Sequence, residues 1–185
     1  MRILAIATIA AALALSPPAE AGKGKGKGKG KAGAKAGKAS GEEAEARAIL
    51  EPFLKPGADL PGLSKQLRPS TADLAAIFEA DLAGKADKIY GPAWDAGQLV
   101  LAPKPGQTAL LLASATSEEL KAGAPPAKEF PGGWAKVTGQ LKPGLRFWRF
   151  KFVEPGKDLG MAFDGLVKVN GHFVIVPKPY RLLGG

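Results

Sequence analysis

Acid-base chemistry in this chain would centre on Asp164, which interrupts an apolar stretch in the last third of the sequence. Strand alternation would place its carboxylate on the face shared with Leu166 and Ile175. A carboxylate removed from water has a raised pKa and is suited to act as a general base. Tyr180 follows in the chain and could donate a hydrogen bond to a substrate. Asp164 and Tyr180 are therefore the candidate catalytic residues.

A structural role would explain the same carboxylate without any catalysis. Asp164 could pair with Arg149, Lys178 or Arg181. It could also cap a β-bulge formed at Gly165. In either case the aspartate would hold the sheet together and would not meet a substrate.

Two basic residues on a neighbouring strand raise a second possibility. Arg149 and Lys151 interrupt a strand face whose other members are apolar. Together with Asp164 they could line a pocket that accepts an anion, or they could lie on a solvent-exposed face of the sheet. These three residues are the candidate pocket residues.

Several common kinds of site are absent from the sequence. The chain has no cysteine and a single histidine, His172, so it cannot build an ordinary transition-metal site. No serine lies in a G-x-S-x-G elbow, and no glycine-rich loop follows a strand to cradle phosphate. We expect His172 to be a structural turn residue, and we expect no metal and no cofactor.

The C-terminal third reads as antiparallel sheet. Alternation predicts strands over 145–153, 161–169 and 172–176. The dipeptide Asn170-Gly171 between the last two is a strong hairpin signal. That turn predicts the pairs Val169 with His172, Lys168 with Phe173, Val167 with Val174 and Leu166 with Ile175.

Helical periodicity dominates the preceding part of the domain. Capping signals and apolar spacing predict helices over 42–51 and 72–90, the second ending at Gly91-Pro92. We place Asp73 opposite the apolar face of the second helix. Short apolar runs at 99–102 and 108–115 flank a turn and predict a hairpin. The sequence therefore indicates an α+β domain with N-terminal helices packed on a curved, mostly antiparallel sheet.

This order of elements resembles the nuclear transport factor 2-like superfamily, which includes ketosteroid isomerase-like proteins. The resemblance is carried at residue level by Phe163-Asp164-Gly165-Leu166-Val167-Lys168-Val169-Asn170-Gly171-His172-Phe173 and Pro177-Lys178-Pro179-Tyr180-Arg181. The closing stretch is also similar to that of small uncharacterised exported bacterial proteins. The superfamily resemblance implies a cone-shaped α+β fold that can enclose a pocket. Its enzymatic members carry acid, tyrosine or histidine groups inside the cone, but our register puts Asp164 and His172 on opposite faces, which counts against catalysis.

The N-terminus predicts export. Residues 1–21 combine a basic start, an apolar stretch and an A-x-A site, the pattern of a cleavable signal peptide. A disordered arm rich in lysine and glycine follows over 22–41, and a single domain occupies 42–185. Because an exported eukaryotic domain of this size would usually carry disulfides, the lack of cysteine favours a bacterial periplasmic or extracellular protein.

The net charge of +9 belongs almost wholly to the arm. Residues 22–41 carry seven lysines and no acid, whereas residues 42–185 carry 18 basic and 16 acidic residues. The arm lysines are Lys23, Lys25, Lys27, Lys29, Lys31, Lys35 and Lys38. The arm could act as a spacer or contact an anionic envelope surface. Because the domain is nearly neutral, we expect no sequence-specific binding of nucleic acid.

Three functions remain compatible with these residues. The first is a non-enzymatic exported domain that binds a small ligand or a component of the cell envelope. The second is an enzyme of lyase or isomerase type that uses Asp164 and Tyr180. The third is a polyanion or membrane-surface binder that acts through residues 22–41.

Overall fold

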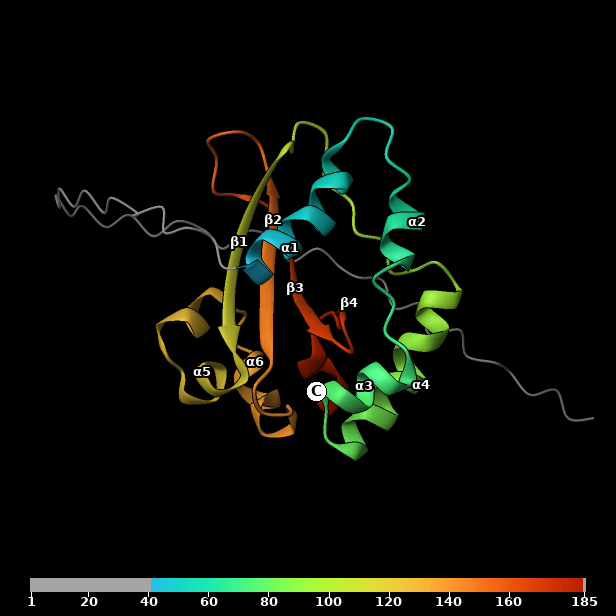
Figure 1. The fold of residues 1–185 in the computed structure, drawn as a ribbon, viewed down its shortest axis with the longest axis vertical. Helices are drawn as coiled ribbons and strands as arrows, with labels where there is room; N and C mark the ends of the chain where they lie inside the picture. Colours follow the sequence, from blue (N-terminus) through green and yellow to red (C-terminus); the bar gives the residue numbers. More distant parts are fainter. Residues whose placement is uncertain (1–40, 185) are drawn as a thin grey trace, which may run out of the picture. The chain divides into compact units, whose positions relative to one another are not determined.

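The computed structural model describes residues 41–184. A four-stranded antiparallel sheet with the order β1-β2-β3-β4 runs through this part of the chain (Figure 1). The strands are β1 (Ala109–Thr116), β2 (Arg146–Val153), β3 (Gly160–Val169) and β4 (His172–Ile175). Because α-helices precede the sheet, the predicted α+β class is confirmed. They are α1 (Gly41–Leu50), α2 (Leu60–Lys65), α3 (Thr71–Ile77) and α4 (Ala80–Asp95). The predicted signal peptide and the arm lysines lie outside the described residues.

The hairpin between β3 and β4 forms as predicted. Asn170 and Gly171 both have positive φ, 50° and 83°, as the two central residues of a type I′ turn require. All four predicted cross-strand pairs are present, from Val169 opposite His172 to Leu166 opposite Ile175. Local turn chemistry thus sets the register of this end of the sheet.

The pairing of β2 with β3 contains an irregularity that the alternation pattern did not predict. Trp148 pairs with Leu166, but Arg149 pairs with Asp164, so Gly165 is an extra residue in β3. Such a bulge reverses the faces of the residues before it. The prediction that Asp164 shares the face of Leu166 is therefore wrong: Asp164 lies on the face of Arg149. The prediction that Asp164 and His172 lie on opposite faces is wrong for the same reason, because Arg149, Val169 and His172 share one face of the sheet.

Helical segments cover both faces of the sheet (Figure 1). On one face, helix α1 (Gly41–Leu50) leads into the 3-10 turn η1 (Glu51–Leu54), and Phe53 stacks on Phe152 with ring centres 6.0 Å apart. On the other face, Trp134 of α6 (Trp134–Val137) meets Phe147 edge-on at 5.1 Å. This second face also carries α5 (Ser117–Ala122) and the 3-10 turn η2 (Pro125–Glu129). A short 3-10 turn, η3 (Thr138–Gln140), follows α6.

The helix predicted over 72–90 is in fact two helices. α3 (Thr71–Ile77) ends at Phe78, which is fully buried and extended, and which forms a β-bridge with Leu141. α4 (Ala80–Asp95) then continues beyond the predicted end at Gly91-Pro92. The missing hydrogen bond at Pro92 is tolerated because Tyr90 and Trp94 both pack into the core.

The predicted hairpin of 99–102 with 108–115 does not form. The turn itself is present, with the Gln107 N–H donating to the Lys104 carbonyl at 3.0 Å. However, the Leu101 N–H donates to the hydroxyl of Ser64 in α2 (Leu60–Lys65) at 2.9 Å, and β1 pairs with β2. A side-chain acceptor from a distant helix has replaced the expected strand partner.

Candidate functional site

The bulge in β3 positions Asp164 against the C-terminal segment. Gly165 has a φ of 90°, and its carbonyl accepts a hydrogen bond from the Val176 N–H at 2.9 Å. A Cβ atom at this position would lie 2.1 Å from the Val176 carbonyl oxygen. Glycine is therefore required here for two reasons, the positive φ and the close approach of another backbone segment.

Asp164 is enclosed by protein groups. Its side chain is buried, the whole residue being 6% exposed, and Oδ1 accepts a hydrogen bond from the Lys178 N–H at 3.2 Å. Lys178 holds a φ of 51°, uncommon outside glycine, in the turn that leads to η4 (Pro179–Leu183). The C-terminal segment thus supplies a backbone donor to the one carboxylate of β3.

Burial raises the pKa of Asp164, and three kinds of neighbour oppose that shift. They are the Lys178 N–H, the indole N–H of Trp134, and the positive charges of Lys178 and Arg149. The indole nitrogen of Trp134 lies near the carboxylate but makes no hydrogen bond of normal geometry. Desolvation exceeds the sum of these effects.

Two tyrosines lie close enough to feel the charge of Asp164. Burial, and then the negative charge of Asp164, raise the pKa of Tyr90 and that of Tyr180. The Tyr90 hydroxyl donates to the Pro177 carbonyl at 3.0 Å. Within the described residues, neither hydroxyl hydrogen-bonds to Asp164. The two candidate catalytic residues are therefore neighbours without a direct polar contact.

The candidate pocket residues are engaged separately. Arg149 makes a long ion pair of 4.0 Å with Glu129 in η2, and the Lys151 ammonium donates to the Asp158 carbonyl at 3.3 Å. Asp164 faces Lys178, as described above. The structure therefore places Arg149 across from Asp164 in the sheet but directs Lys151 toward the β2–β3 connection.

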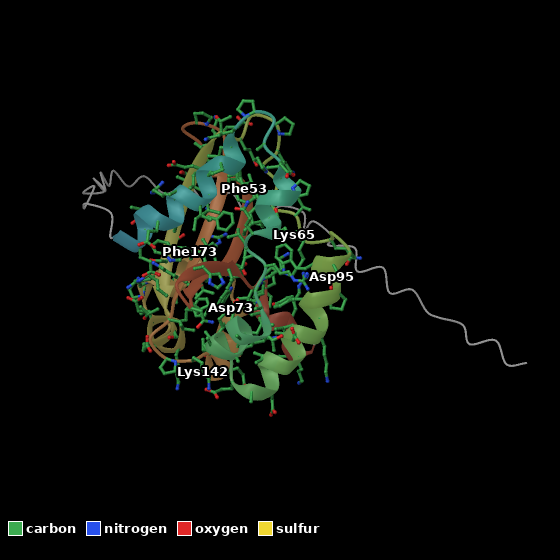
Figure 2. All side chains as sticks on the ribbon, turned by 45° about the vertical axis from the view of Figure 1, so that its right-hand side comes forward. Phe53, Lys65, Asp73, Asp95, Lys142 and Phe173 are labelled. Carbon is green, nitrogen blue, oxygen red and sulfur yellow. The ribbon has the colours of Figure 1, made fainter. Side chains whose placement is uncertain are left out.

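A second buried carboxylate, Asp73, was missed as a site residue by sequence reasoning. It is 2% exposed and lies on the inner side of α3, between that helix and the sheet (Figure 2). Oδ2 accepts hydrogen bonds from the N–H and the hydroxyl of Ser70 at 2.8 and 2.7 Å, and Oδ1 accepts one from the Asn170 amide at 2.7 Å. The prediction that Asp73 lies opposite the apolar face is wrong.

The partner that completes this cluster is His172. Its Nε2 lies 3.2 Å from Asp73 Oδ2, and its Nδ1 lies 3.4 Å from the Asn170 carbonyl. Burial of Asp73 opposes ionisation, but the hydrogen bonds from Ser70 and Asn170 and the charge of His172 together lower its pKa. Ser70 donates to Asp73 and not to the imidazole, so these residues do not form a nucleophilic triad.

This cluster joins α3 to the β3–β4 turn. The sequence carried part of the signal, because Ser70 and Asp73 have the spacing of a capping box and Asn170 stands in a hairpin turn. Nothing in the local sequence pattern linked the capping box to the hairpin turn, because Asp73 and Asn170 are 97 residues apart.

The loop of residues 55–58 is flanked by a hollow on each side. One, of about 380 Å³, lies between that loop and α2. The other, of about 310 Å³, lies between the loop and residues 103–108. Asp164, Tyr180, Arg149 and Lys151 line neither of them.

Other kinds of site find no support in residues 41–184. In this part of the chain, no group of three or more histidine and acidic side chains could hold a metal ion. The same residues include no helix that is long and apolar enough to cross a membrane. The arm lysines, proposed to contact an anionic surface, lie outside the described residues.

Comparison with known proteins identifies no relative. No protein family, curated protein or solved structure matches this chain. The structure establishes an α+β fold with a four-stranded antiparallel sheet, and the comparisons identify no family for it.

Proposed function

We propose that this chain is an exported, non-enzymatic module whose folded domain binds a small ligand or a component of the bacterial cell envelope. One observation carries the proposal. The two buried carboxylates of the described domain, Asp73 and Asp164, are enclosed by protein groups, whereas the two hollows lie elsewhere and are open. Binding on an open surface needs no buried base.

Export rests on the signal-peptide pattern of the first 21 residues, and the lack of cysteine favours a bacterial over a eukaryotic exported protein. In the proposed arrangement the signal peptide is removed and residues 22–41 tether the domain or keep it clear of the membrane. The arm lysines would add weak contacts with anionic lipid or polysaccharide.

If this domain bound a ligand as the resemblance to the nuclear transport factor 2-like superfamily implies, the ligand would lie in an internal pocket. Members of that superfamily enclose a pocket between helices and sheet. In this domain the sheet face beneath α1 and η1 is filled by four phenylalanine rings that contact one another, with centres 5.2 to 6.0 Å apart. They are Phe53, Phe150, Phe152 and Phe163. A filled interior favours a ligand site on the outside.

An enzyme of lyase or isomerase type is the second candidate, and a specific observation favours it. Asp164 has a raised pKa and lies near Tyr180, which are the two properties that an acid-base pair would need. The structural reading of the same residues is a carboxylate that anchors the C-terminal segment through Lys178. The enclosure of Asp164 makes us prefer binding.

The test exposes the purified protein to an envelope extract and identifies bound and released compounds by mass spectrometry. We expect one compound to be retained and recovered chemically unchanged, in equal amount by the wild type and by Asp164→Asn. Conversion of a compound by the wild type and not by Asp164→Asn would establish the enzyme and overturn the proposal.

A separate comparison addresses the arm. Binding to heparin and to anionic vesicles is measured with and without residues 22–41 at two salt concentrations. If the arm carries polyanion binding, its removal abolishes the interaction, and salt weakens what the intact chain shows. Binding that is the same without residues 22–41 and at both salt concentrations excludes the arm as the polyanion site.

A further inference from the structure

The hollow of about 310 Å³ is built from two copies of the same tripeptide. Lys55-Pro56-Gly57 forms one wall and Lys104-Pro105-Gly106 forms the other. Figure 1 shows the connections after η1 and before β1 at the same end of the sheet. The two turns, 49 residues apart in sequence, thus place two lysines on the lining of one hollow.

The walls are held by backbone hydrogen bonds and proline. On one side the Lys55 N–H donates to the Pro52 carbonyl and the Ala58 N–H donates to the Lys55 carbonyl, both at 3.2 Å. On the other side the Lys104 N–H donates to Gln107 Oε1 at 2.9 Å. A preformed hollow loses little conformational entropy when a ligand binds.

The interior of the hollow is largely apolar. Phe53, Leu54, Leu60 and Pro103 belong to its lining. Phe53 is buried and stacks on Phe152 of the sheet, so this part of the surface is fixed to the core. Such a lining favours hydrocarbon over a wholly polar ligand.

The charged residues that line the hollow are both lysines. Lys55 and Lys104 are exposed and line it, and within residues 41–184 neither ammonium group has a hydrogen-bond or ion-pair partner. No carboxylate belongs to the lining. Two acids border it: Asp59 stands between the lining residues Ala58 and Leu60 and accepts a hydrogen bond from the Gly62 N–H at 3.0 Å. Glu154 lies behind the other wall, where its Oε1 would be 3.7 Å from a Cβ atom at Gly106. Two free cations above an apolar floor are complementary to an anion with a hydrocarbon tail.

We infer that this hollow binds a single-chain anionic amphiphile, by pairing its carboxylate or phosphate head with Lys55 and Lys104 and by burying its tail against the apolar lining. The inference rests on the proposed function and names the ligand class. The volume lies at the low end of the roughly 300–1,000 Å³ typical of ligand sites and the hollow is open to solvent, so one short chain would lie in it with part of its surface exposed. Because the surface is hollowed, we favour a free monomer over a flat bilayer.

Isothermal titration calorimetry with alkyl phosphates, below their micelle concentrations, tests the inference on the full protein. Affinity should rise about fourfold for each added CH₂, until the hollow is full. Lys55→Met and Lys104→Met should each weaken decyl phosphate binding by about two- to fivefold, and more when combined. Decanol and inorganic phosphate, which carry only the tail or only the head, should bind more weakly than decyl phosphate.

The third copy of the tripeptide supplies the matched control. Lys142-Pro143-Gly144 lies away from the hollow, and its lysine pairs with Glu79 at 2.7 Å. Lys142→Met should leave the affinity for decyl phosphate unchanged. Equal affinities of the wild type and the Lys55→Met/Lys104→Met double variant for decyl phosphate would overturn the inference. Binding of inorganic phosphate as tight as that of decyl phosphate would also overturn it, and so would binding to anionic vesicles without any binding of monomeric decyl phosphate.

The outcome can be separated from that of the proposed function. Absence of alkyl phosphate binding, while an envelope compound is still retained unchanged, refutes the amphiphile and leaves the binding module standing. Chemical conversion of an envelope compound in an Asp164-dependent manner refutes the binding module, whatever the calorimetry shows.

Discussion

The cluster around Asp73 makes the strongest prediction about stability. Its carboxylate caps α3 through Ser70 and also accepts hydrogen bonds from Asn170 and His172 in the β3–β4 turn. Asp73→Ala keeps the bond from the backbone N–H of position 73 to the Ser70 hydroxyl, but it removes the reciprocal half of the capping box, the two bonds that Ser70 donates, worth about 1 kcal/mol. It also removes the charge-assisted bond to the Asn170 amide, worth about 1.5–3 kcal/mol, and an imidazole contact that is half exposed and adds at most about 1 kcal/mol. We expect a total loss of about 2.5–5 kcal/mol.

A matched control lies in α5. Thr116 and Glu119 form the same kind of capping box, and Glu119 has no further hydrogen-bond partner in the described residues. Glu119→Ala should therefore cost only about 1 kcal/mol. Urea unfolding followed by tryptophan fluorescence measures both, because Trp94, Trp134 and Trp148 are buried. Equal losses for Asp73→Ala and Glu119→Ala would refute the stabilising role of Asn170 and His172.

The pH dependence of this cluster has a definite sign. The pKa of Asp73 is lowered in the folded protein, so its ionisation stabilises the fold at pH values above about 4, the ordinary aspartate pKa. This contribution is lost as the pH falls from there through the folded pKa. The difference in unfolding free energy between the wild type and Asp73→Asn should accordingly shrink below about pH 4. A difference that stays constant from pH 7 to pH 3 contradicts the assignment.

Three further outcomes follow from the contacts around the C-terminal segment. Burial raises the pKa of Asp164, so ionisation of this group destabilises the fold increasingly as the pH rises above about 4. In urea titrations between pH 4 and pH 7, Asp164→Asn should therefore gain stability relative to the wild type. A difference in stability that does not depend on pH argues against this. Gly165→Ala should lower the free energy of unfolding by more than about 3 kcal/mol, because of the positive φ and the overlap with the backbone of Val176. Gly171→Ala has a positive φ but open space around it, and should lower that free energy by about 1 kcal/mol. Similar losses for the two variants would show that the contact with Val176 is unimportant. Tyr90→Phe leaves a backbone carbonyl without its donor and should cost about 1–2 kcal/mol in thermal unfolding, and an unchanged midpoint would contradict this.

Reasoning from sequence reached the fold class because the governing signals are short-range. Apolar alternation over nine residues and the dipeptide Asn170-Gly171 determine the β3–β4 hairpin and its register. Helical spacing and Pro52 similarly predict a helix over 42–51, and α1 spans Gly41–Leu50. In each case the deciding residues lie within one turn or one strand of each other.

The same reasoning could not place the buried carboxylates. Asp164 was assigned to the wrong face because a bulge at Gly165 depends on the approach of Val176, which strand alternation does not encode. Asp73 was assigned to the outer face of a helix because its partners stand 97 and 99 residues away in the chain. Its capping box was visible in the sequence, but its burial was not.

The sequence by itself determined the nearly neutral charge of the domain, the lack of cysteine, the single histidine and the antiparallel hairpin, since composition and local turn geometry suffice for these. Only the tertiary structure decided which polar groups are enclosed. It closed the C-terminal segment over Asp164, and it brought Lys55 and Lys104 to one hollow although 49 residues separate them. The burial of a polar group and the proximity of two side chains arise when segments distant in the sequence pack together, and a local sequence pattern does not predict that packing.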